Sequence, residues 1–166
     1  MSRARSSRVG VLMVSSTAFV VMARKAERGT VSDREERIFR AFNTLSPSLR
    51  APVWLVMQAG SFGAIPVSAA IAFPRYRRTS LSLALGGTAA WSLCKLVKRV
   101  VKRGRPADHL TEPVVHGNAQ RGSGFPSGHA AVATTLATIL SCVLPRRAAR
   151  IVWGVPVVVC CARQYV

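Results

Sequence analysis

Apolar runs of about 15 to 20 residues alternate along this chain with short clusters of Arg and Lys. Alternation of this kind is typical of membrane-spanning helices that are flanked by charged loops. We therefore expect an all-α integral membrane helical bundle with about five spanning helices. The predicted spans are 9–23, 53–73, 81–97, 130–144 and 151–166.

The first apolar run, 9–23, follows Arg3, Arg5 and Arg8 and precedes Arg24. A charged start, an apolar middle and small residues near its end also describe a secretory signal. Fifteen residues rise only about 22 Å as a helix, whereas a hydrocarbon core is about 30 Å thick. We expect an uncleaved first helix, and a cleaved signal is the open alternative.

The next two runs carry residues that bend or pack helices. Gly60 and Pro66 interrupt the run 53–73, so we expect a helix that is bent or broken there. In the run 81–97, the pair Gly86-Gly87 offers a surface for close helix packing.

Residues 30–45 have a different pattern, in which apolar residues recur at helical spacing among charges. Ser32 and Glu35 have the spacing of a capping box. We expect a short amphipathic helix on the membrane surface, although a packing helix of the soluble type fits the pattern equally well. We divide the chain into 1–50, which holds the first span (or signal-like segment) and this helix, and a membrane domain at 51–166.

The chain is strongly basic, with 24 Lys and Arg against 6 Asp and Glu. A nucleic-acid-binding protein is the competing interpretation, but it predicts base-stacking aromatic residues, and only 7% of residues are aromatic. We therefore expect a membrane protein without a nucleic-acid partner. The four cysteines lie in apolar runs and form no CxxC pair, so a zinc or redox site has little support.

Basic loops indicate an orientation. With the N-terminus in the cytoplasm, the basic loops 75–78 and 145–150 also lie there, as the positive-inside rule requires. The same alternation places 98–129 and Arg163 on the extracytoplasmic side. The segment 24–50 falls on that side too, and its seven Lys and Arg count against this orientation.

Two polar stretches carry the candidate chemistry. Seven residues apart on a helix, Lys98 and Arg105 differ by about 20° in direction, so they share a face on which Lys102 lies between them. Pro106 would then help to end the helix. Taken alone, this run favours an ordinary basic flank of a membrane helix.

The second stretch opens the fourth span. Ser127 is a natural N-cap, and Gly128 lets the backbone approach a ligand closely. The free N–H groups of such a helix start bind anions. His129, in the first turn, can donate a proton near neutral pH to the leaving oxygen of a phosphate ester. Together with Lys98 and Arg105, these residues predict a phosphate-handling site.

The two stretches resemble the signatures of the type 2 phosphatidic acid phosphatase superfamily, in its membrane lipid phosphatase branch. Lys98, six residues and then Arg105-Pro106 match the first signature, and 126–129, Pro-Ser-Gly-His, match the second. The resemblance covers residues 50–166.

A third signature of that family reads Ser-Arg, five residues, His, three residues, Asp. Ala162-Arg163 resembles its start, with Ala162 in place of Ser, and the given sequence stops before the His. We therefore expect a member truncated within this signature, which also lacks the last of the six spans that the family has. Without the nucleophile we expect the chain as given to be inactive.

The resemblance implies a phospho-histidine mechanism that needs no metal or other cofactor. In it His129 protonates the leaving alcohol. The implied substrates are polyprenyl phosphates or pyrophosphates, phosphatidic acid and phosphatidylglycerol phosphate, hydrolysed at the outer face of the cell membrane. The implied phosphate-binding residues are Lys98, Arg105, Ser127, Gly128 and Arg163.

Other interpretations remain. The chain could be a non-catalytic membrane protein that binds anionic lipid headgroups through its basic clusters. Vanadate-dependent haloperoxidases share the signatures, but most are soluble. Asp108, His109, Glu112 and His116 have irregular spacing, which favours a solvated loop over a metal site. The stretch 117–124 predicts a loop over the site, in which Arg121 is expected to be solvated.

Overall fold

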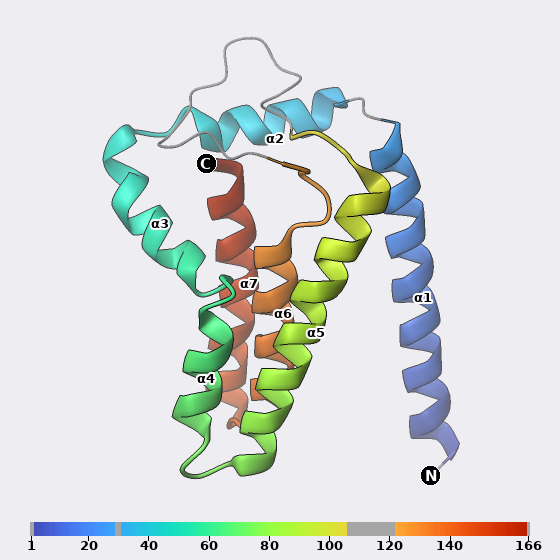
Figure 1. The fold of residues 1–166 in the computed structure, drawn as a ribbon, viewed down its shortest axis with the longest axis vertical. Helices are drawn as coiled ribbons and strands as arrows, with labels where there is room; N and C mark the ends of the chain where they lie inside the picture. The colour runs from blue at the N-terminus through green and yellow to red at the C-terminus, as the bar shows by residue number, and fades with distance from the viewer. Residues whose placement is uncertain (1, 29–30, 106–121, 166) are drawn as a thin grey trace.

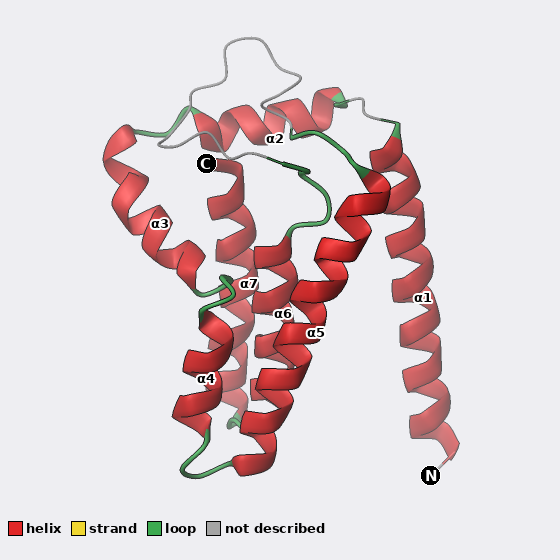
Figure 2. Cartoon of the chain, viewed as in Figure 1, coloured by secondary structure: helices red, strands yellow, loops and turns green. Residues whose placement is uncertain are grey.

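A computed structural model describes residues 2–28, 31–105 and 122–165 (Figure 1). Helices and loops make up these described residues (Figure 2), so the predicted all-α fold is confirmed. The elements are α1 (Ser2–Glu27), α2 (Asp33–Asn43), the 3-10 helix η1 (Pro47–Leu49), α3 (Arg50–Gln58), α4 (Ala64–Ala72), α5 (Arg77–Val101), α6 (Gly128–Ser141) and α7 (Arg146–Tyr165).

The core of the bundle lies between α4, α5 and α6. Helix α6 packs against both α5 and α7, and α4 packs against α5. Leu83 and Val132 are fully buried at the centre, because these apolar positions face neighbouring helices. The core cluster consists of Ile65, Ala69, Ala72, Leu83, Val132 and Leu136.

Glycines lie where the sequence pattern predicted a bend and a close helix contact. The run 53–73 is broken into α3 and α4 by a turn at 59–63, as expected. A Cβ on Gly87 would lie 2.8 Å from Ile65 Cγ1, and one on Gly86 would lie 3.0 Å from Ile139 Cδ1. The pair therefore lets α5 approach α4 and α6 closely, which confirms the predicted packing surface.

Helix α2 begins with the predicted capping box. The N–H of Glu35 donates to Ser32 Oγ, and Ser32 N–H donates to Glu35 Oε2 at 3.0 Å. Figure 1 shows α2 lying across the end of the bundle where α7 ends. Phe39 and Asn43 are buried, whereas Ile38 is exposed. The helix therefore packs through one face and leaves some apolar surface uncovered.

The ends of the helices follow the predicted alternation. In Figure 1 the start of α1 and the α4–α5 connection lie at one end of the bundle. The last turns of α5 and α7 lie at the other end. The basic loop at 75–78 therefore lies at the opposite end of the bundle from the last turns of α5 and α7.

Among the described residues, one helix, Arg77–Val101, is both long and apolar enough to cross a membrane. The expectation of five spanning helices is therefore not confirmed as such. Helices α3 and α4 have nine residues each, or about 14 Å of rise, because the turn at 59–63 divides the predicted span. Helix α1 leaves many large apolar side chains exposed, among them Val11, Leu12, Met13 and Val14.

We predict that Ser80→Ala lowers the stability of the bundle. The buried Ser80 hydroxyl donates to the Ala69 carbonyl at 2.7 Å and joins α5 to α4. Loss of such a bond costs about 0.5–1.5 kcal/mol. Thermal unfolding in detergent micelles measures the change. Ser82→Ala is the matched control, because its hydroxyl is exposed and bonds within α5 to the Arg78 carbonyl. Equal melting temperatures for the two variants would contradict the prediction.

Candidate functional site

The last turn of α5 corrects one prediction. The helix ends at Val101, and Lys102 caps it with a φ of 47°, in the left-handed region. Residues 103–105 therefore leave the helix axis, and the Lys102 side chain is exposed. The prediction that Lys98, Lys102 and Arg105 share one helix face was wrong. Pro106, which was expected to help end the helix, lies outside the described residues.

The turn nevertheless brings Arg105 back towards Lys98. The positive charges of Arg105 and Arg163 both act on the Lys98 ammonium group. The two cations of the first signature are therefore neighbours through a chain reversal, and not through a shared helix face.

Residues 122–124 hold this reversal in place. The Gly124 N–H donates to the Arg103 carbonyl at 2.7 Å, and Arg105 Nε donates to the Gly122 carbonyl at 3.3 Å. A Cβ on Gly124 would lie 2.8 Å from the Gly104 carbonyl oxygen, so only glycine allows this approach. This part of the predicted loop is a backbone brace between the two signatures. Residues 117–121, including Arg121, lie outside the described residues.

The start of α6 has the predicted form. Ser127 is the N-cap, and its Oγ accepts a hydrogen bond from the Ala130 N–H at 3.4 Å. A Cβ on Gly128 would meet nothing within 4 Å, so the backbone is open to a ligand there. His129 follows in the first turn and is partly buried. The ring of Phe125 stacks on Phe19 of α1, with centroids 5.9 Å apart.

Gly60 packs against the main chain of His129. A Cβ on Gly60 would lie 2.5 Å from the His129 carbonyl oxygen and 3.0 Å from Val159 Cγ1. The turn at 59–63 therefore packs closely between the start of α6 and α7. The sequence pattern marked Gly60 only as a point of bending, because a glycine needed for close approach carries no separate signal.

The last turn of α7 supplies Arg163. Its Nη1 is buried and has no hydrogen-bond partner among the described residues. A buried, unpaired charged donor is costly, so a position facing such a group favours an anion. Two residues further on, the buried Tyr165 donates its hydroxyl to the Ser46 carbonyl at 2.9 Å and fixes this turn.

Positive charge surrounds His129. Burial lowers the pKa of His129 below its ordinary value, and the charges of Arg163, Lys98 and Arg105 lower it further. His129 precedes the predicted span 130–144, and this environment disfavours its protonated form. The structure thus gathers Lys98, Arg105, His129 and Arg163 at one end of the bundle, with the α6 N-terminus carrying Ser127 and Gly128.

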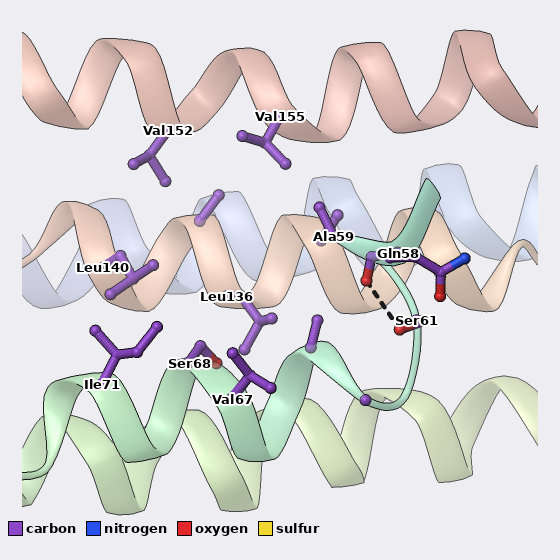
Figure 3. A pocket seen from close by; sticks show the side chains of 14 residues that line it. Gln58, Ala59, Ser61, Val67, Ser68, Ile71, Leu136, Leu140, Val152 and Val155 are labelled. Carbon is purple, nitrogen blue, oxygen red and sulfur yellow. Dashed lines mark hydrogen bonds between the residues drawn. The ribbon is translucent and has the colours of Figure 1, made fainter. Parts of the chain in front are cut away.

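A cavity of about 560 Å³ lies between α4, α6 and α7 (Figure 3). Its lining is mostly apolar and includes Ile71, Leu136 and Leu140. One end of the cavity lies at the turn 59–63, where the Ser61 hydroxyl donates to the Gln58 carbonyl at 2.8 Å. The same turn packs on the main chain of His129 at Gly60, but the residues that line the cavity do not include the candidate site residues.

In the part of the chain that the structure describes, no three His, Cys, Asp or Glu side chains gather as metal ligands. All four cysteines are free thiols. The polar group considered as a metal site, Asp108, His109, Glu112 and His116, lies outside the described residues.

Comparison with known families decides the classification. The sequence model of the PAP2 superfamily matches residues 77–166, which include every candidate site residue. The chain belongs to the PAP2 superfamily. Membership in the PAP2 superfamily confirms the resemblance and implies hydrolase chemistry of the phosphatase type on phosphorylated lipids or small phosphate compounds. Searches among curated proteins and among solved structures gave no match.

We predict that Gly60→Ala disturbs the site of this PAP2 protein. Its methyl group would meet the His129 carbonyl, and overpacking of this kind costs about 1–3 kcal/mol. Both the melting temperature and the affinity for inorganic phosphate, measured in detergent micelles, are expected to fall. Gly63→Ala, in the same turn, is the control, because its Cβ would make only an ordinary contact at 3.5 Å. Equal effects of the two substitutions would show that Gly60 does not position His129.

A second prediction concerns the protonation of His129. Its imidazole is expected to titrate below the ordinary value of about 6.5 in the phosphate-free protein. Since the unfolded chain then binds the proton first, this group lowers stability as pH falls below about 6.5. Bound phosphate, an anion, is expected to raise the pKa. Histidine NMR titration with and without phosphate measures it, and His129→Gln assigns the signal. A midpoint that phosphate leaves unchanged would separate His129 from the anion site.

Proposed function

We propose that this PAP2 protein is a multi-pass membrane phosphatase that acts on a lipid phosphate or pyrophosphate at the outer face of the cell membrane. One observation carries the proposal: the buried Nη1 of Arg163 has no partner among the described residues, and its charge acts on both Lys98 and His129. A phosphoryl group supplies the acceptor oxygens that such a donor needs.

Phosphate binding is assigned to both signatures and to the end of α7. Lys98, Arg105 and Arg163 supply positive charge, and Ser127 and Gly128 supply the backbone N–H groups of the α6 N-terminus. In phosphoryl transfer the charge spreads over three equatorial oxygens. Fixed donors around these oxygens stabilise the transition state without rearranging.

His129 is assigned the role of general acid. Its imidazole takes up a proton as the phosphate ester binds and gives it to the leaving oxygen when the P–O bond breaks. In the mechanism that the family resemblance implies, a histidine at the third-signature position attacks phosphorus and forms a P–N bond, which water then hydrolyses. Residues 1–166 do not contain a histidine after His129, so this polypeptide is expected to bind phosphate without turning over.

The apolar cavity between α4, α6 and α7 supports a lipid substrate over a small soluble phosphate. Its volume of about 560 Å³ falls within the range of ligand pockets, and its apolar lining suits an acyl or isoprenoid chain. The exposed apolar side chains of α1 and the basic loops support placement in a membrane. Polyprenyl phosphate or pyrophosphate, phosphatidic acid and phosphatidylglycerol phosphate all satisfy these requirements.

Binding of orthovanadate tests the proposal, because vanadate copies the shape and charge of phosphate. Arg163→Ala removes a charged donor worth about 1.5–3 kcal/mol, so affinity is expected to fall about tenfold to hundredfold. Isothermal titration calorimetry of residues 1–166 in detergent micelles measures it. Arg150→Ala is the control, because Arg150 is exposed near the other end of the same helix.

Wild-type affinity in Arg163→Ala would overturn the assignment of Arg163. Phosphate release from phosphatidic acid in the same micelles serves as a second readout, and residues 1–166 are expected to release negligible phosphate. Robust release would show that the reaction does not need the third-signature histidine.

A further inference from the structure

The cations of the site come from the ends of two different helices. Lys98 and Arg105 come from the end of α5, and Arg163 comes from the last turn of α7. Each charge acts on at least one of the others. Like charges at this range repel, and the repulsion grows with burial. Without an anion, the repulsion therefore drives the ends of α5 and α7 apart unless other contacts hold them.

One such contact joins α2 to the end of α5. Arg103 Nη2 donates to Glu35 Oε1 at 3.1 Å, and the Arg103 side chain is only 13% exposed. The other carboxylate oxygen of Glu35 accepts from both Ser32 N–H and Ser32 Oγ, so the carboxylate is fixed at both oxygens. Burial raises the pKa of Glu35, but the hydrogen bonds from Ser32 and Arg103 outweigh it and leave the pKa below its ordinary value.

A second contact joins the other end of the same segment to α7. Tyr165 is 1% exposed, and its hydroxyl donates to the Ser46 carbonyl at 2.9 Å. Helix α2 also packs on α7, with Asn43 buried. Tyr165 stands two residues after Arg163, so this bond fixes the turn that carries the third cation.

We propose that residues 32–46 form a strap that holds the ends of α5 and α7 at the separation a phosphate group needs. Glu35 in the strap and Tyr165, which bonds to the Ser46 carbonyl of the strap, are the positioning residues. Neither has to touch the substrate. Figure 1 shows α2 crossing the bundle between the ends of α5 and α7. The strap rests on the proposed phosphate site. It acts by preorganisation, which raises affinity by removing the ordering that binding otherwise requires.

The sign of one substitution separates the strap from local electrostatics. Glu35→Gln removes a negative charge near the cations, so charge alone would tighten the binding of an anion. The strap instead predicts weaker binding, by about three- to tenfold, because the ion pair that ties the Arg103 segment to α2 is lost. Tyr165→Phe releases the α7 end and is expected to weaken binding by a similar factor. Calorimetry with orthovanadate on residues 1–166 in micelles measures both.

The double variant gives a second criterion. A strap fails when either end is released, so Glu35→Gln with Tyr165→Phe should bind vanadate about as well as the weaker single variant. If the double variant lost affinity by the product of the two single losses, each residue would act only on the helix end that it contacts. That result would overturn the strap, and so would unchanged or tighter binding by Glu35→Gln.

A control separates positioning from a general loss of stability. Glu36→Gln removes the exposed ion pair between Glu36 and Arg40, 2.7 Å long, on the same helix. This variant is expected to lower the melting temperature slightly and to keep vanadate affinity. If it weakens binding as much as Glu35→Gln does, the strap is overturned. Absence of vanadate binding by the wild-type chain would instead overturn the proposed function.

Discussion

Crowded positive charge at one end of the bundle is the constraint on which the rest of the structure depends. Two unit charges about 4 Å apart repel by about 1 kcal/mol in water and by about 4 kcal/mol at an effective dielectric constant of 20. The charges of Arg105 and Arg163 act on Lys98, and all three cations act on His129. Every contact that holds this end together therefore works against repulsion until an anion binds.

Backbone contacts without side chains provide much of that support. Gly60 packs on the His129 carbonyl, and Gly124 packs on the backbone at Gly104. At both points a methyl group would overlap a carbonyl oxygen, so the distance between segments is fixed by main-chain atoms. Main-chain atoms have fewer ways to relax than long side chains, which suits a site that must keep several donors in place.

Local patterns predicted the helices well, because hydrophobic runs, the break at 59–63 and the Ser32–Glu35 capping box depend on neighbouring residues. The end of α5 was not predictable in this way, since Lys102 adopts a left-handed conformation that Gly or Asn would have signalled. The pairs Glu35–Arg103 and Tyr165–Ser46 join residues 68 and 119 positions apart, and no local pattern contains them. The candidate site residues were found through signature spacing, whereas the contacts that support them became visible only in three dimensions.

The stacking of Phe19 on Phe125 gives α1 a part in the architecture of the site. Helix α1 runs without interruption through Val21 and Ala23, where a signal sequence would be cut, and it carries Phe19 on the N-terminal side of that point. Cleavage there would remove the aromatic partner of the residue that precedes Pro126. The N-terminal helix thus contacts the segment that leads into α6, and that contact depends on the retention of α1 in the mature protein.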